Sequence, residues 1–252
     1  MTTKTHVFRL EQNLDKIYDY YMSDTNRCVI VGGAPIENYE YIRSFLRDDD
    51  FVVYCDAGLT HKKELGACAS LIVGDFDSHE RPVTEAEVIV LPHEKDDTDT
   101  FYAVKECLKR GFSDFLLLGM TGGRLDHTLG NLQALVMLDE AGVRACMVDD
   151  YSEISMVSGS GDIAWEECEK SSNLYGATVT EAYRFFSLIA VGGDAYGVTV
   201  TGAKYPLTCA TLTCDFPLGV SNEVLPGEEA HVTLERGRVL LMKVIRDVND
   251  HC

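Results

Sequence analysis

Two clusters of aspartate could bind a metal ion. In the first, Asp75 and Asp77 belong to the pentapeptide Gly-Asp-Phe-Asp-Ser, which directly follows the apolar run 71–73. If the chain is extended there, alternate side chains share a face, and the two Cα atoms lie roughly 6–7 Å apart. Two carboxylates placed in this way can share a hard cation. The alternative interpretation of so short a motif is an acidic turn after a strand.

The second cluster, Lys-Asp-Asp-Thr-Asp, opens a helical pattern and contains Asp96, Asp97, Thr98 and Asp99. Asp and Thr are also favoured at helix N-termini as caps and as partners of the helix dipole, which is the alternative interpretation. A cap needs only one such residue, however, and neighbouring carboxylates repel one another unless a cation is present. The cluster therefore indicates a second source of carboxylates for the same metal.

A glycine-rich loop, Gly-Met-Thr-Gly-Gly-Arg-Leu-Asp-His, runs from Gly119 to His127 between an apolar run and a helical pattern. A loop that leads into a helix N-terminus presents backbone N–H groups to an anion, and Arg124 could add a bidentate phosphate contact. The glycine spacing matches neither the P-loop nor the dinucleotide-binding fingerprint. A plain strand-to-helix turn is the alternative.

Alternating strands and helices must position these motifs. Apolar runs predict strands at 28–32, 51–55, 70–74, 87–91, 114–119 and 143–148, and helical patterns fall at 36–47, 98–110 and 126–141. This alternation predicts an α/β domain with a mainly parallel sheet, in which ligands bind beyond the carboxyl ends of the strands. All three motifs fall there. Carboxylates for a metal and donors for phosphate are the parts that phosphoryl-type transfer needs.

The second half of the chain has a different sequence pattern. Short runs rich in Val, Thr, Leu and Ile predict strands at 185–191, 197–200, 207–214, 230–235 and 239–245, which is typical of an all-β sandwich or barrel. We therefore expect four segments: an N-terminal appendage (1–26), an α/β catalytic domain (27–157), a connecting excursion (158–182) and a β-sandwich domain (183–252).

Composition excludes several functional classes. The 252 residues carry 41 acidic and 22 basic side chains, a net charge of −19 that repels phosphate backbones, so we expect no nucleic-acid partner. No apolar run approaches the length of about 18 residues that a membrane span needs, and the first residues contain no signal-peptide apolar region. Nine cysteines without a C-x-x-C pair favour reduced core residues over a zinc site. We expect a cytoplasmic protein.

In this order and spacing, Gly-Asp-Phe-Asp-Ser, Lys-Asp-x-Thr-Asp and Gly-Gly-Arg-x-Asp-His resemble the signature of the thiamin pyrophosphokinase family. Gly-Ala-Lys-Tyr-Pro-Leu (202–207) and Gly-Val-Ser-Asn-Glu (219–223) are similar to its C-terminal motifs, so the resemblance covers about residues 28–246. It implies an α/β domain, a C-terminal β-sandwich and a homodimer. It also implies that pyrophosphate passes from ATP to the hydroxyl of thiamin with Mg²⁺, giving thiamin diphosphate and AMP.

The resemblance further implies roles for individual residues. The expected metal ligands are Asp75, Asp77 and Asp99, with Asp56 near the same site. The expected nucleotide-binding residues are Thr98, Gly122, Gly123, Arg124, Asp126 and His127. Asp96 and Asp97 are the candidate proton acceptors. Ser221 and Asn222 are expected to contact thiamin across the dimer interface. Tyr205 is either a stacking residue or a core tyrosine at a strand end.

One departure from the family pattern concerns Asp56. The family often has Asp-Gly-Gly after its second strand, whereas this chain has Asp56-Ala57-Gly58. Alanine restricts positive φ, so we rank Asp56 behind the other three metal-ligand candidates.

Three other functions fit part of the pattern. A haloacid-dehalogenase-like phosphatase uses a D-x-D motif, but that motif normally ends the first strand of its domain, and here it follows the third predicted strand. A pterin pyrophosphokinase of related fold would use a different acceptor. A nucleotide-binding regulator with a decayed site is a non-enzyme alternative that the intact motifs disfavour.

Overall fold

The computed structural model of the chain describes residues 26–76, 84–92, 94, 96–160 and 176–245. These fall into two compact units, one from Asp24 to Tyr151 and the other from Ser152 onward. Residues 1–25 of the predicted appendage and 161–175 of the predicted excursion lie outside the described residues. Each unit is described by itself.

The first unit is built on a parallel sheet with the strand order β4-β3-β2-β1-β5-β6. Its strands are β1 (Arg27–Val31), β2 (Phe51–Cys55), β3 (Leu71–Gly74), β4 (Glu87–Val90), β5 (Asp114–Leu118) and β6 (Arg144–Val148). The central strand β1 is buried along its whole length, and β5 is buried from Phe115 onward. Such continuous apolar runs are typical of strands covered on both faces.

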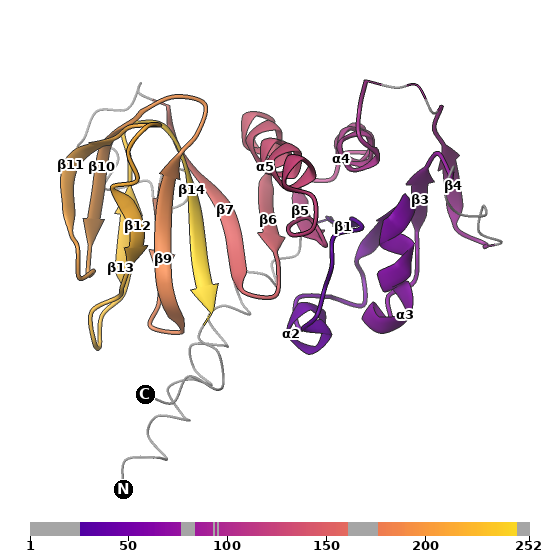
Figure 1. Cartoon of the computed structure of the whole chain (residues 1–252), viewed down its shortest axis with the longest axis horizontal. Coiled ribbons are helices and arrows are strands. Elements are labelled where there is room, and N and C mark those ends of the chain that lie inside the picture. Colours follow the sequence, from indigo (N-terminus) through magenta and orange to yellow (C-terminus); the bar gives the residue numbers. More distant parts are fainter. Residues whose placement is uncertain (1–25, 77–83, 93, 95, 161–175, 246–252) are drawn as a thin grey trace, which may run out of the picture. The chain divides into compact units, whose positions relative to one another are not determined.

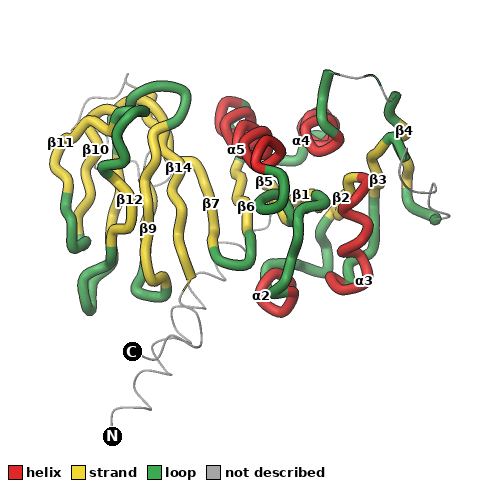
Figure 2. Tube along the Cα trace, in the orientation of Figure 1, coloured by secondary structure: helices red, strands yellow, loops and turns green. Residues whose placement is uncertain are grey.

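Helices cover both faces of this sheet (Figure 1). They are α2 (Tyr39–Arg43), the 3₁₀ helix η1 (Asp56–His61), α3 (Lys62–Leu65), α4 (Asp99–Lys109) and α5 (Leu125–Glu140). The longer helices α4 and α5 lie on one face, and α2 and α3 lie on the other (Figure 2). No helix in the described part of the chain is long and apolar enough to cross a membrane.

One predicted helix is much shorter than expected. The pattern at 36–47 gives only α2, because Asn38 caps its start by accepting a hydrogen bond from the Tyr41 N–H. At its end the Ser44 hydroxyl donates to the Tyr41 carbonyl at 2.6 Å, which competes with continuation of the helix. The segment 32–38 before it is therefore a loop.

The strand order places a switch point between β1 and β5. The chain leaves β1 toward β2 on one side and returns to β5 on the other, so the loops that follow β1 and β5 lie next to one another at the carboxyl edge. Ligands of open α/β sheets bind at such switch points. The loop after β1 is Gly32–Asn38, and the loop after β5 is Gly119–Arg124.

The second unit is a sandwich of antiparallel strands. One sheet has the order β12-β9-β14-β7 and the other β11-β10-β13-β8, and one residue pair, Tyr196 with Arg236, links β10 to β14. The strands are β7 (Ser152–Ser160), β8 (Gly176–Val179), β9 (Tyr183–Ala190), β10 (Ala195–Thr201), β11 (Leu207–Leu212), β12 (Gly219–Asn222), β13 (Ala230–Thr233) and β14 (Arg236–Ile245). Side chains from both sheets form one apolar core, including Phe186, Val200 and Leu241.

The predicted fold class, an α/β domain followed by an all-β sandwich, is confirmed. The sequence pattern did not predict β7, β8, β12 or the helical stretch 56–65. Residues 152–157, which we expected in the α/β domain, belong to β7, and β7 pairs with β14 in the second unit.

Candidate active site

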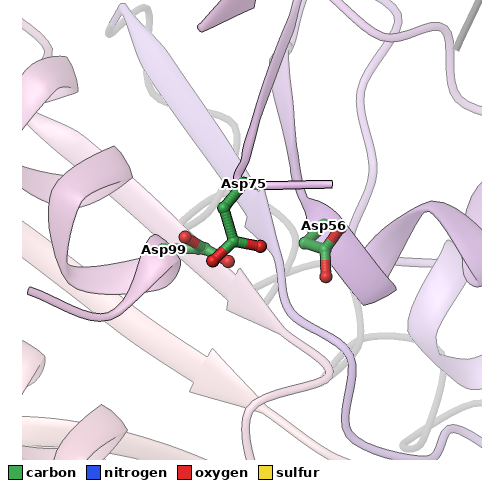
Figure 3. A group of neighbouring side chains, drawn as sticks. All are labelled: Asp56, Asp75 and Asp99. Carbon is green, nitrogen blue, oxygen red and sulfur yellow. The ribbon is translucent and has the colours of Figure 1, made fainter. Parts of the chain in front are cut away.

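Three aspartates meet at the carboxyl edge of the parallel sheet. Asp56 follows β2, Asp75 follows β3 and Asp99 opens α4, and Figure 3 shows that they come from three separate segments. One carboxylate oxygen from each lies within 4.8 Å of the others, and all three residues are half-buried. Three negative charges this close favour a bound cation, and carboxylate oxygens are the donors that hard cations such as Mg²⁺ prefer. The donor set therefore fits a magnesium ion.

Asp56 belongs to this cluster as fully as the other two, which changes its expected rank. Its backbone has a φ of 32°, whereas Ala57 does not have a positive φ, so the alanine does not prevent the turn. The side chain of Asp56 packs against Gly74 of the next strand. A Cβ added to Gly74 would lie 3.0 Å from the Asp56 Cβ and 3.3 Å from its Oδ1. Gly74 therefore leaves the space that Asp56 occupies.

The pairing of Asp75 with Asp77 that we expected requires the extended backbone of β3 to continue through the motif. The strand ends before the motif's first aspartate. Strand β3 ends at Gly74, and Phe76 has a φ of 52°, in the left-handed region. Asp77 itself lies outside the described residues. The motif follows the third strand of its unit, which differs from the position expected in a haloacid-dehalogenase-like phosphatase.

The residues before α4 divide into different environments. Thr98 is the N-cap of α4, and its hydroxyl accepts from the Phe101 N–H at 3.2 Å. Asp97 forms an ion pair with Lys105 at 2.6 Å, outside the three-aspartate cluster. Asp96 is exposed. The acidic run therefore contributes Asp99 to the cluster and Thr98 to the helix cap.

The glycine-rich loop has the backbone freedom that its sequence suggests. Gly119, Gly122 and Gly123 have φ values of 62°, 90° and 61°, where residues with a Cβ are disfavoured. Arg124 is the N-cap residue of α5 and makes no side-chain cap hydrogen bond. The loop thus leads directly into a helix N-terminus, the arrangement that favours anion binding.

Arg124 and Asp126 are paired with one another in this loop. The guanidinium donates to both carboxylate oxygens, at 3.1 and 2.5 Å, and both side chains are exposed. This contact lowers the pKa of Asp126 to about 2 and raises that of Arg124. An arriving phosphate would compete with Asp126 for Arg124. His127 is exposed in the first turn of α5.

Sequence reasoning missed the residues that anchor the loop. The Thr121 hydroxyl donates to Asp149 at 2.7 Å, and the Asn131 side chain donates to the Met120 carbonyl at 2.8 Å. Asp149 follows β6, and Asn131 lies in the second turn of α5. The position of Asp149 after the last parallel strand is the one signal that could have identified it.

The three residues expected at thiamin lie in the second unit. Asn222 is buried and uses its side chain on the backbone: Oδ1 accepts from the N–H groups of Tyr205 and Glu223, and Nδ2 donates to the Tyr205 carbonyl. Tyr205 is 58% exposed, so it is not a core tyrosine. Ser221 is exposed and has a φ of 60°. Asn222 therefore holds Tyr205 in place, and Tyr205 and Ser221 face outward.

The two halves of the chain match two family models. The model of the thiamin pyrophosphokinase catalytic domain matches residues 42–147, and the model of the vitamin B1 binding domain of the same enzyme matches residues 177–239. The chain belongs to the thiamin pyrophosphokinase family. Thiamin pyrophosphokinases are enzymes that transfer pyrophosphate from ATP to thiamin, so the predicted family, activity and co-substrate are confirmed.

Curated relatives carry the same name. Thiamine pyrophosphokinase of Bacillus subtilis (strain 168) is 29% identical over 207 residues, which span 78% of this chain and 88% of the relative. Thiamin pyrophosphokinase 1 of Caenorhabditis elegans is 26% identical over 208 residues, which span 78% and 81%. Both thiamin pyrophosphokinases therefore align along most of their length.

Solved structures of thiamin pyrophosphokinases share the fold. The enzyme from Geobacillus thermodenitrificans superposes with a TM-score of 0.70 at 25% identity and covers 88% of this chain and 99% of that one. The Bacillus subtilis structure gives 0.71 at 24% identity, over 88% and 100%. The yeast structure gives 0.66 at 13% identity, over 88% and 87%. The latter two likenesses, below 25% identity, concern the fold alone.

Proposed function

We propose that Asp56, Asp75 and Asp99 hold Mg²⁺ in this thiamin pyrophosphokinase and that the loop Gly119–Arg124 binds the phosphates of ATP. The observation that carries the proposal is the meeting of the three carboxylates at the edge of the sheet where the glycine loop also lies. Strands β2 and β5 are separated by β1, so their ends lie roughly 10 Å apart. A nucleoside triphosphate can span that distance.

The chain's own groups have complementary tasks in this account. The N–H groups of the loop and the α5 N-terminus attract the phosphates, and Arg124 exchanges Asp126 for a phosphate oxygen. When bound, Mg²⁺ supplies positive charge that offsets the charge on the transferring group. The thiamin hydroxyl attacks the β-phosphorus, the bond from the β-phosphorus to the oxygen of AMP breaks, and AMP leaves.

A group that accepts the proton of the thiamin hydroxyl completes the reaction. The candidates from the sequence are Asp96 and Asp97. Asp97 is engaged with Lys105 in an ion pair at 2.6 Å, so its carboxylate already has a partner. We therefore propose Asp96, which is exposed, as the acceptor.

Thiamin is proposed to bind the second unit at Tyr205 and Ser221, in a homodimer whose interface forms the site. Phe216, Leu218 and Val220, around the start of β12, are 63%, 48% and 46% exposed. Exposed apolar side chains that lie close to Ser221 in the sequence are the kind of surface that a second copy would bury. Light scattering tests the dimer through the mass of the particle.

We further propose a reducing, cytoplasmic compartment. The cysteines in the described part of the chain form no disulfide, and Cys28, Cys55 and Cys107 are buried in the parallel-sheet unit. Burial raises the pKa of Cys28 and Cys55, which keeps these thiols protonated. Such cysteines behave as small apolar core residues.

The test is product analysis of the full chain with ATP, Mg²⁺ and thiamin. The proposal expects AMP and thiamin diphosphate in equal amounts, and no AMP when Mg²⁺ is removed by a chelator. Hydroxymethylpterin in place of thiamin should give no AMP, and acid quenching should trap no aspartyl-phosphate. AMP formation from ATP with hydroxymethylpterin but not with thiamin would contradict the proposal. So would a trapped aspartyl-phosphate.

A further inference from the structure

His61 is a buried histidine that the reaction described above does not use. It ends η1, and only 6% of its surface is exposed. Its ring lies between two partners from distant parts of the sequence: Nε2 is 2.9 Å from the Ala34 carbonyl oxygen, and Nδ1 is 2.7 Å from the Tyr39 hydroxyl. A buried polar ring with both nitrogens engaged has a defined orientation.

The partners fix the tautomer of this ring. A carbonyl oxygen can only accept, so Nε2 carries the proton and donates to Ala34. In the neutral ring Nδ1 is then an acceptor, and the Tyr39 hydroxyl donates to it. Burial lowers the pKa of His61, which agrees with a neutral ring. Tyr39 thus orients His61, and His61 holds the backbone at Ala34.

Ala34 connects His61 to the glycine-rich loop. Its N–H donates to the Gly119 carbonyl at 3.0 Å, while its own carbonyl accepts from His61. Next to it, Pro35 lies beside the loop: a Cβ added to Gly123 would lie 3.6 Å from the Pro35 Cδ. The segment after β1 is therefore bonded to the start of the loop and lies beside its glycine pair.

The far end of the same segment is fixed independently. The Asp150 carboxylate accepts from the N–H groups of Glu37 and Asn38, at 2.9 and 2.8 Å. Asp150 thus holds the end of the segment Gly32–Asn38, and His61 holds its middle. Of these two residues, His61 is the one that contacts Ala34, which bonds to Gly119.

We propose that His61, oriented by Tyr39, is a positioning residue for the nucleotide: it holds Ala34 so that the loop Gly119–Arg124 is already in its phosphate-binding conformation before ATP arrives. The inference rests on the proposed role of that loop. Preorganisation of this kind lowers the cost of ordering a loop on binding. Its loss should weaken ATP binding and leave thiamin binding unchanged.

Two substitutions test the roles of the two ring nitrogens of His61 one at a time. In His61→Gln the side-chain amide can replace Nε2 and still donate to the Ala34 carbonyl. In His61→Asn the shorter amide can replace Nδ1 and accept from Tyr39, but it does not reach Ala34. His231→Asn, at an exposed histidine of β13, is the matched control.

The readouts are amide hydrogen exchange at Ala34 in the protein without ligand, and the KM values for ATP and thiamin. We expect His61→Asn to speed exchange at Ala34 and to raise the KM for ATP about tenfold, the loss expected for one hydrogen bond. The KM for thiamin should not change. His61→Gln should restore both values, and His231→Asn should match the wild type. Exchange and ATP KM at wild-type values in His61→Asn would overturn the inference.

Two further outcomes keep the test decisive. If His61→Asn does not fold, Tyr39→Phe replaces it, and the inference then requires faster exchange at Ala34 than in the wild type; exchange at the wild-type rate would overturn it. If the wild type releases no AMP from ATP and thiamin, the proposed function fails. Hydrogen exchange at Ala34 still decides whether His61 positions the loop.

Discussion

Asn222 holds Tyr205 by its backbone through two hydrogen bonds, accepting from the Tyr205 N–H at 3.0 Å and donating to the Tyr205 carbonyl at 2.8 Å. This relationship makes Asn222 a support for the proposed thiamin site. Asn222→Ala removes both bonds and a third one to the Glu223 N–H. We expect the free energy of unfolding to fall by about 1 kcal/mol or more, because partly buried backbone groups lose three hydrogen bonds. Urea denaturation measures the change.

The same variant should raise the KM for thiamin, since Tyr205 would no longer be fixed. Tyr205→Phe, which keeps the ring and the backbone contacts, is the control and should retain the wild-type stability. An Asn222→Ala protein with both the stability and the thiamin KM of the wild type would contradict the supporting role.

Arg124 supplies the second prediction. Its bidentate pairing with Asp126 shows that it can form the contact that a phosphate would receive. Arg124→Ala should raise the KM for ATP by about 10-fold or more, because a charged hydrogen bond to the phosphate is lost. Arg124→Lys should recover only part of this loss, because lysine cannot bind in a bidentate manner. Full recovery by lysine would argue against a bidentate contact.

Gly74 gives a prediction about the metal site. It does not have a positive φ, so alanine suits its backbone, and the added Cβ would only press on Asp56. Gly74→Ala should therefore leave the fold intact and raise the Mg²⁺ concentration needed for half-maximal activity several-fold. Gly130→Ala in α5, where an added Cβ meets nothing within 4 Å, is the matched control. Equal magnesium requirements in the two variants would count against Asp56 as a ligand.

The buried His61 predicts a pH dependence of stability. Burial lowers its pKa below the ordinary value of 6.5, while the Ala34 carbonyl and the charge of Asp150 act in the opposite direction, and Tyr39 donates to its ring. Below pH 6.5 the unfolded chain binds a proton that the folded chain takes up less readily. This contribution to stability is therefore complete above about pH 7 and is lost as the pH falls below 6.5.

The measurement is the urea midpoint of the wild type and of His61→Gln at pH 7.5 and pH 5.5. The wild type should lose more stability on acidification than His61→Gln, which has no group that titrates there. Equal losses in the two proteins would assign the acid sensitivity to other groups.

The strands of the first unit could be predicted because burial on both faces produces continuous apolar runs, as in 28–31 and 115–118. β12 could not, because its short sequence Gly-Val-Ser-Asn resembles a turn. β7 contains four serines, which mask its alternation, and its pairing with β14 is a contact between distant parts of the chain.

The site residues that could be predicted are those recognised by their residue type and by their position at the end of a predicted strand. Asp75 and Asp99 follow from their motifs. That Asp56 lies in the cluster on equal terms with the other two aspartates could not be predicted. Its side chain occupies the space that Gly74, which has no side chain, leaves in the neighbouring strand. Asn222 depends on Tyr205 lying across from it, and the Ala203–Val224 bridge that brings these segments together is not visible in the sequence.

The most direct test of the account is the rate of AMP release from ATP and thiamin, with Mg²⁺, by Asp75→Asn. Asp75 is one of the three clustered carboxylates, and its loss should remove a ligand without removing bulk. The account predicts a fall of roughly 100-fold or more, as expected when a major source of charge stabilisation is lost. Asp48→Asn, at an exposed aspartate, should retain full activity. Near-normal turnover in Asp75→Asn would contradict pyrophosphate transfer at this cluster.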